Sequence, residues 1–150
     1  MQARILRPGD EALLAAAAAA IEDDAPSPDR CRALLADPCF VAVVPIDGDQ
    51  PAGLTYGHVL PQLTRTALLI YSVDTAESHR RRGAARAMID ALRHLSTERG
   101  YYEMWVLTSA ANEPAMRLYA GCGGVRDTFD DVMWVFPLAA PSGLASSTPT

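Results

Sequence analysis

The stretch His79-Arg80-Arg81-Arg82-Gly83-Ala84-Ala85 organises the middle of this 150-residue chain. It follows an apolar, strand-like run and precedes a long amphipathic pattern. A turn of small residues at the start of a helix leaves backbone N–H groups free, and the helix dipole favours an anion there. We therefore interpret the stretch as a diphosphate cradle built without lysine, although a solvated basic turn would use the same residues.

The segments on either side of this stretch predict a strand, a helix and a second strand. Residues 66–75 and 102–108 are apolar runs, and residues 82–98 place apolar side chains at helical spacing before Gly100. A crossover through a helix is right-handed and joins parallel strands, so the two strands should lie side by side within a mixed sheet. The apolar helix positions are Ala85, Met88, Ile89, Leu92 and Leu95.

The remaining sequence predicts one α/β (α+β) domain over residues 1–138, with a mixed sheet that includes an antiparallel meander. A hairpin turn is expected at Asp47-Gly48-Asp49-Gln50, and an acidic run, Glu22-Asp23-Asp24, lies between the first two helices. Residues 139–150 are rich in Pro, Ser and Thr and predict a disordered tail. The predicted strands are 2–7, 40–46, 52–60, 66–75, 102–108 and 132–138, and the predicted helices are 11–21, 29–36, 82–98 and 113–120.

Composition excludes several classes of function. The net charge of −5 argues against a nucleic-acid binder, and all thirteen basic residues are arginine, so no lysine can serve a Walker loop or a Schiff base. Three cysteines without CxxC spacing and three histidines without an HExxH pattern predict no metal site. The apolar run 12–21 is shorter than the ~20 residues of a membrane span, so we expect a cytoplasmic protein with reduced thiols.

A second motif lies about thirty residues after the first. It is Asn112-Glu113-Pro114-Ala115-Met116-Arg117-Leu118-Tyr119. In these two motifs the chain resembles the GCN5-related N-acetyltransferase (GNAT) family, whose Arg/Gln-x-x-Gly-x-Gly/Ala loop is matched by Arg80, Gly83 and Ala85. Its Asn-x-x-Ala-x-x-Leu-Tyr motif is matched by Asn112, Ala115, Leu118 and Tyr119. The resemblance covers residues 2–138 and implies a fold in which strands 66–75 and 102–108 splay apart.

The resemblance implies acetyl-CoA as cosubstrate, without a metal, in the cleft between the splayed strands. Backbone groups of Val73 and Thr75 would pair with the pantetheine arm, and the Asn112 side chain would bind that arm as well. The loop and the helix start would hold the diphosphate. The complete set implied for the cofactor is Val73, Thr75, Arg80, Arg81, Arg82, Gly83, Ala84, Ala85, Asn112 and Ala115.

The reaction implied by the family is direct attack of an amine on the thioester. Tyr119 stands where the family's phenol gives a proton to the departing thiolate, although it could also be a core tyrosine. Because an ammonium must first lose a proton, a carboxylate is needed within reach. Asp74 is our candidate base, and strand alternation could direct it either to the acceptor or to solvent. Glu77 and the pair Asp130-Asp131 are the other candidates.

Within that family the chain also resembles the aminoglycoside 3-N-acetyltransferases, through segments 70–71, 79–83, 113–115 and 130–133. In those enzymes acidic residues at corresponding positions form a polyanionic pocket, which implies substrate binding by Asp23, Asp24, Asp130 and Asp131. Acidic helix ends are also common solvated features. This chain departs from them at Ser72, where they tend to carry an aspartate, and at Trp134, where they carry a histidine.

Three hypotheses follow from these observations. The first is acetyl transfer to a small cationic amine, with an aminoglycoside as the expected acceptor. The second is acetyl transfer to a peptide N-terminus, a polyamine or an amino acid. The third is a noncatalytic acyl-CoA-binding sensor. The family and the apolar strand predicted over residues 132–138 also imply a homodimer, because that strand would otherwise leave an exposed edge.

Overall fold

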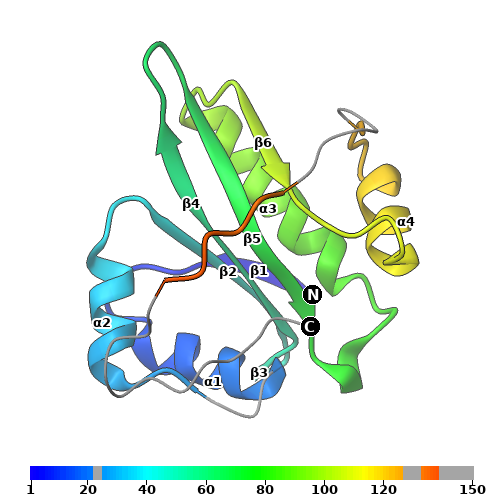
Figure 1. Ribbon diagram of the computed structural model, residues 1–150. Helices are drawn as coiled ribbons and strands as arrows, with labels where there is room; N and C mark the ends of the chain where they lie inside the picture. Colours follow the sequence, from blue (N-terminus) through cyan, green and yellow to red (C-terminus); the bar gives the residue numbers. More distant parts are fainter. Residues whose placement is uncertain (22–24, 127–132, 139–150) are drawn as a thin grey trace.

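A mixed β-sheet forms the centre of the computed structural model, which describes residues 1–21, 25–126 and 133–138. The strand order is β1-β2-β4-β5-β6, and the short β3 pairs with β2 (Figure 1). The strands are β1 (Gln2–Ile5), β2 (Phe40–Asp47), β3 (Gln50–Pro51), β4 (Gly53–Pro61), β5 (Thr66–Thr75) and β6 (Glu103–Val106). The helices are α1 (Glu11–Ile21), α2 (Pro28–Ala36), α3 (Ala84–Glu98) and α4 (Glu113–Gly121), with a 3₁₀ turn at Glu77–His79.

The strand pairing confirms the predicted unit around the central stretch. β5 and β6 are parallel and are joined through α3, whereas the other pairs in the described chain are antiparallel. β2 turns into β3 through Gly48 and Asp49, with Asp47 opposite Gln50, as the hairpin prediction requires. The α/β class with a mixed sheet, a meander and one parallel pair is therefore confirmed.

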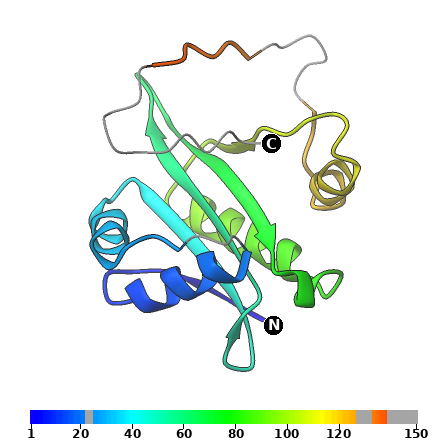
Figure 2. The same ribbon diagram turned by 60° about the horizontal axis from the view of Figure 1, so that its bottom comes forward.

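Two apolar cores lie on opposite faces of the sheet (Figure 2). α1 and α2 cover one face, where Leu14, Ala17 and Cys31 are buried against β2 and β4. α3 covers the other face with the predicted apolar positions, and Met88 and Leu92 are almost inaccessible there. Because α3 buries its apolar face against β1, β2 and β5, the start of this helix is held firmly below the end of β5.

A β-bulge interrupts the pairing of β4 with β5. Tyr56 lies opposite Ser72 and Gly57 lies opposite Ile70, so Tyr71 is the extra residue on β5. Gly57 is required at this place, because a Cβ built on it would lie 2.0 Å from the carbonyl oxygen of Leu69. A bulge re-aims the side chains that follow it, and bulges are common beside active sites.

Three element predictions are corrected. α3 begins at Ala84, two residues later than expected, because Arg81 and Gly83 adopt positive φ angles of 61° and 86°, which a right-handed helix excludes. β6 spans Glu103–Val106 and is shorter than the predicted run 102–108. β1 ends at Ile5, although Leu6 still donates its N–H to the Ala42 carbonyl.

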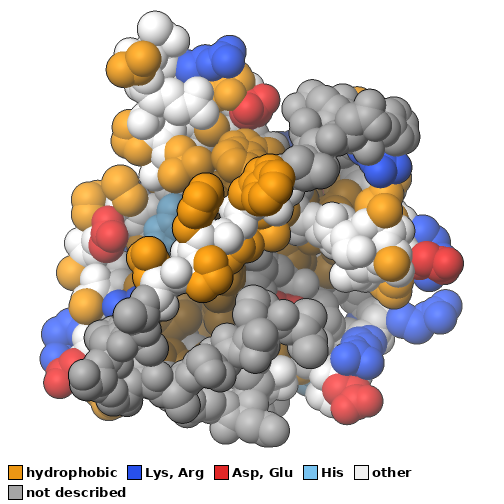
Figure 3. Space-filling model, viewed as in Figure 1, with side chains coloured by type: hydrophobic (Ala, Val, Ile, Leu, Met, Phe, Trp, Pro, Cys, Tyr) orange, Lys and Arg blue, Asp and Glu red, His pale blue; other side chains and the backbone are white. Residues whose placement is uncertain are grey.

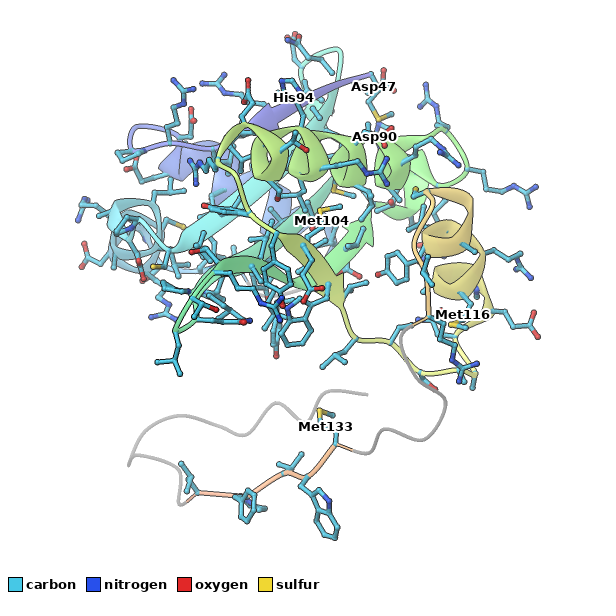
Figure 4. All side chains as sticks on the ribbon, turned by 90° about the horizontal axis from the view of Figure 1, so that it is seen from above. Asp47, Asp90, His94, Met104, Met116 and Met133 are labelled. Atoms are coloured by element: carbon cyan, nitrogen blue, oxygen red, sulfur yellow. The ribbon has the colours of Figure 1, made fainter. Side chains whose placement is uncertain are left out.

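The predicted last strand, residues 132–138, is wrong for the residues that the structure describes. Residues 133–138 carry no strand, and they stand apart from the sheet (Figures 2 and 4). An apolar run becomes a strand only where an edge pairs with its backbone, and Pro137 cannot donate to such a ladder. Residue 132 and the predicted tail, 139–150, lie outside the described residues.

Candidate active site

The free edge of β5 begins where the sheet splays. The parallel pairing with β6 ends at Ile70 and Val106, so β5 continues from Tyr71 to Thr75 without β6 beside it. Thr55 Oγ1 donates to the Ser72 carbonyl from the β4 side, and Ala76 N donates to Ala52 on that same side. Since alternate residues of a strand address opposite edges, the backbone groups of Val73 and Thr75 face the open edge.

The loop between β5 and α3 combines open backbone with two left-handed residues. Arg81 and Gly83 have positive φ angles, and a Cβ placed on Gly83 would meet no atom within 4 Å. The first helical bond across the α3 start runs from the Ala87 N–H to the Gly83 carbonyl. The N–H groups of Gly83, Ala84 and Ala85 therefore have no acceptor within the helix, and Gly83 borders open space, whereas Ala84 is buried.

The three arginines of this loop are not equivalent. Arg82 forms an ion pair with Asp47 at the end of β2, with 2.9 Å between Nη2 and Oδ2, and His79 Nε2 lies 3.6 Å from the same carboxylate oxygen. Arg80 and Arg81 are exposed, and no ion pair in the described part of the chain engages them. Arg82 is thus tied to the protein, whereas Arg80 and Arg81 project from it.

Asn112 caps α4. Its Oδ1 accepts a hydrogen bond from the Ala115 N–H at 3.2 Å, and Pro114 stands in the first turn, where its missing N–H costs nothing. The oxygen of Asn112 and the N–H of Ala115 are therefore partners of each other. The Asn112 amide nitrogen is the part of this side chain that the cap does not use.

Tyr119 lies on the inner face of α4 and is half-buried beside Cys122, Met104 and Val106. Burial raises the pKa of the phenol above its ordinary value, and the negative charge of Asp74 adds to that shift. The phenol therefore keeps its proton at neutral pH.

α4 is fastened to α3 by two arginines. Arg86 Nη2 donates to the Gly121 carbonyl at 2.9 Å, and Arg93 Nη2 donates to the Cys122 carbonyl. These bonds occupy carbonyls that a helix end otherwise leaves without partners. Because α4 has no fully buried residue, the two arginines are a main part of what fixes Tyr119 in place.

The register of β4 with β5 decides where Asp74 points. Asp74 lies opposite Leu54, and Ser72 lies opposite Tyr56. Residues that face each other in a ladder project to the same side of the sheet. Leu54 and Tyr56 belong to the α1 and α2 side, so Asp74 projects there too, and Ser72 Oγ donates a hydrogen bond to its carboxylate.

A pocket of about 380 Å³ opens on this same side of the sheet. Phe40, Tyr56 and His58 bring rings to a lining that is otherwise mostly aliphatic. Phe40 lies 6.0 Å from Tyr56 and 5.7 Å from His58, and Tyr56 also stacks on Tyr71 of β5 at 5.4 Å. Arg30 at the start of α2 is the charged side chain among the lining residues that the structure describes. Hydrophobic side chains dominate the middle of the surface in this view (Figure 3).

Sequence reasoning missed this aromatic pocket, although part of its signal was available. Tyr56 and His58 alternate along β4 and share a face, which a strand prediction implies. Tyr71 joins them because of the bulge, and Phe40 joins them because β2 pairs with β4. Neither of these two contacts has a local sequence signature.

The acidic residues predicted to bind substrate, Asp23, Asp24, Asp130 and Asp131, lie outside the described residues. Trp134, which stands where the similar enzymes carry a histidine, is 81% exposed. In the described segments no group of His, Cys, Asp or Glu is arranged to hold a metal ion. None of the helices described here is both long and apolar enough to cross a bilayer.

Comparison with known proteins establishes the class of protein. The profile of the Acetyltransferase (GNAT) family matches residues 11–123, which covers most of the chain. The chain therefore belongs to the GNAT family and is an N-acetyltransferase. The mixed sheet with one parallel strand pair agrees with that assignment. No curated protein sequence matches the chain significantly.

The chain is also similar to solved structures of acetyltransferases. An aminoglycoside acetyltransferase from an uncultured soil metagenomic sample has a TM-score of 0.82 and 27% identity, covering 92% of this chain and 98% of the other. A ribosomal-protein-alanine N-acetyltransferase from Brucella melitensis biovar Abortus 2308 has a TM-score of 0.73 and 19% identity, covering 91% and 100%. An aminoglycoside N-acetyltransferase in complex with CoA has a TM-score of 0.72 and 15% identity, covering 90% and 93%. The last two show the fold alone.

Proposed function

We propose that this protein transfers an acetyl group from acetyl-CoA to a primary amine of a small cationic acceptor, an aminoglycoside of the 3-N type. The observation that carries the proposal is the free end of β5. Its open edge faces the cofactor loop, Asp74 projects from it toward the aromatic pocket, and Tyr119 approaches from α4. An acyl donor and an amine acceptor can thus meet across one strand.

The residues present fit acetyl-CoA. Val73 and Thr75 offer backbone groups to the amides of the pantetheine arm, in the manner of an added strand. The N–H groups of Gly83, Ala84 and Ala85 have no acceptor within the helix, and the open space beside Gly83 suits a diphosphate at a helix start. Arg80 and Arg81 project from the loop and add positive charge, and the Asn112 amide nitrogen can donate to the arm. When bound, acetyl-CoA supplies an activated acetyl thioester.

The catalytic roles follow from charge and position. The Asp74 carboxylate accepts a proton from the acceptor ammonium, directly or through a water, which exposes the lone pair of the amine. Ser72 orients that carboxylate by its hydrogen bond. The Tyr119 hydroxyl, whose raised pKa keeps it protonated, gives its proton to the sulfur as the thiol leaves. The proposed base, Asp74, thus belongs to the end of β5, whereas the proposed acid, Tyr119, belongs to α4.

The aromatic pocket supports a ring-shaped, cationic acceptor. Flat aromatic faces attract ammonium groups through the ring quadrupole and cover the apolar faces of sugar rings. In sequence, the acidic run 22–24 connects Ile21 with Ala25, and both of these flanking residues line the pocket. The 27% identity to a metagenomic aminoglycoside acetyltransferase supports the same class of acceptor.

Arg30 favours a second candidate acceptor. Its guanidinium lines the pocket without an ion pair in the described residues, and a free guanidinium repels a polycation but binds a carboxylate. An amino acid or a peptide N-terminus, with an amine near a carboxylate, would use it. Replacing Arg30 with methionine should weaken the binding of such an acceptor. The binding of an aminoglycoside should stay the same or improve.

We also propose a homodimer. Met133, Trp134 and Phe136 are strongly exposed, and β6 pairs only with β5 in the described chain. A second copy would cover this apolar surface and pair with the outer edge of β6. Gel filtration coupled to light scattering measures the mass directly, and a monomer at micromolar concentration would contradict the proposal.

Thiol release from acetyl-CoA tests the proposed function. The acceptor panel contains gentamicin-like aminoglycosides, polyamines, amino acids and short peptides. We expect turnover confined to aminoglycosides. Turnover only with amino acids or peptides would keep the enzyme class and replace the acceptor by the second candidate. CoA binding without turnover on any amine would contradict the proposed reaction.

A further inference from the structure

The loop that borders the cofactor space is anchored by a residue far away in sequence. Asp47, the last residue of β2, receives both Arg82 at 2.9 Å and His79 at 3.6 Å on the same oxygen, Oδ2. The two partners flank Arg80 and Arg81, so the carboxylate holds the loop at both ends. Figure 4 labels Asp47 close to the part of the molecule where α3 begins.

Asp47 belongs to a well-ordered hairpin. It is paired in register with Gln50 across the turn, and its side chain is only one-third exposed. A second bond ties the same region together, because Ala76 donates its N–H to the Ala52 carbonyl at 3.0 Å. The hairpin therefore supports a loop that contains two left-handed residues after its 3₁₀ turn.

From this geometry we infer that Asp47 is a positioning residue for the diphosphate part of the cofactor, acting through Arg82 and His79. The inference rests on the proposed use of acetyl-CoA. It also assigns Arg82 to the support of the loop and leaves Arg80 and Arg81 to meet the phosphates. Asp47 itself does not touch the cofactor.

Whether CoA binding becomes weaker or tighter when Asp47 is replaced distinguishes a positioning role from plain electrostatic repulsion. A carboxylate near a diphosphate repels it, so its removal should tighten CoA binding if charge alone matters. If Asp47 positions the loop, its removal should weaken CoA binding despite the lost repulsion. Asp47→Asn keeps the shape of the side chain and removes the charge, so it separates these two effects.

The experiment measures binding of CoA and of pantetheine by calorimetry, and kinetics with acetyl-CoA and with S-acetylpantetheine, which lacks the diphosphate. For Asp47→Asn we expect a KM for acetyl-CoA and a Kd for CoA raised about five-fold, the scale of a partly exposed ion pair. The KM for S-acetylpantetheine and kcat should not change. Asp49→Asn, on the exposed tip of the same hairpin, is the matched control and should behave as wild type.

A double-mutant cycle with Arg82→Gln completes the test. If Arg82 acts with Asp47, the double variant should bind CoA no more weakly than either single variant. Unchanged or tighter CoA binding in Asp47→Asn would overturn the inference. An equal rise in the KM values for acetyl-CoA and S-acetylpantetheine would overturn it as well. If wild type binds no CoA, the proposed function fails and the inference with it. Wild-type CoA binding that Asp47→Asn does not weaken overturns only the inference.

Discussion

We propose that the two halves of the site recognise their ligands by different means. On the cofactor side, β5, the loop 79–83 and the start of α3 offer mainly backbone groups, and they follow one another along the chain. On the acceptor side, side chains from α1, α2, β2 and β4 line one pocket. Backbone recognition depends on conformation and tolerates varied side chains, whereas a side-chain pocket changes with each substitution. The comparison teaches that the cofactor half defines the family and the acceptor half defines the substrate.

The largest expected effect falls on the cofactor half. Gly83→Val should abolish CoA binding, because the branched side chain enters the open space that we assign to the diphosphate and also strains a φ of 86°. Isothermal calorimetry with CoA measures the loss. Gly100→Val, at the far end of α3 with a φ of 70°, carries similar strain away from the site. Equal CoA affinity in both variants would contradict the proposed diphosphate site at the start of α3.

Tyr119→Phe tests the residue that both halves share. We expect kcat to fall about 100-fold, since the departing thiolate loses its proton donor, with little change in the KM for acetyl-CoA. Stopped-flow detection of thiol release measures the rate. Tyr101→Phe, in the same core but remote from the strand ends, should leave kcat unchanged. A Tyr119→Phe enzyme with normal kcat would mean that another group or water supplies the proton.

Tyr56→Leu should affect only the acceptor half. Removing the aromatic face while keeping apolar bulk should raise the KM for a cationic acceptor about ten-fold, within the range of a desolvated cation–π contact. The KM for acetyl-CoA should stay the same, and Tyr56→Phe should restore most of the affinity. A parallel rise in both KM values would show that the two halves are not separable.

The smallest effect is on stability at high pH. Since the pKa of Tyr119 is raised in the folded protein, the fold binds this proton more tightly than the unfolded chain does. Its contribution to stability is complete below the ordinary phenol pKa of about 10 and is lost as pH rises above it. The melting temperature should therefore fall less steeply between pH 8 and about pH 11 in Tyr119→Phe than in wild type. If the melting temperatures of the two proteins fall in parallel with pH, the raised pKa of Tyr119 is contradicted.

Much of the fold was predictable because its signals are local. The spacing of Met88, Ile89 and Leu92 predicted the buried face of α3, and the turn at Asp47–Gln50 predicted a hairpin that forms. The run 132–138 shows the limit of such signals. Its apolar residues suggest a strand, but pairing needs an available edge, and residues 133–138 stand alone.

The candidate site divides in the same way. The positions of Arg80, Gly83, Asn112 and Tyr119 were expected from two motifs, and the structure places them around the splayed strands. The bond between Arg82 and Asp47 joins residues 35 positions apart and has no sequence pattern to predict it. The direction of Asp74 was open until the register with Leu54 settled it.

By itself, the sequence determined the class of this protein: a lysine-free, acidic chain with the loop and helix motifs of an acetyltransferase. Those motifs are local because backbone N–H groups and helix starts are made by neighbouring residues. Only the tertiary structure decided that Asp74 projects to the α1 and α2 side of the sheet, that Arg82 pairs with Asp47, and that Arg86 and Arg93 contact the end of α4. These contacts join distant segments, and strand register and packing determine them.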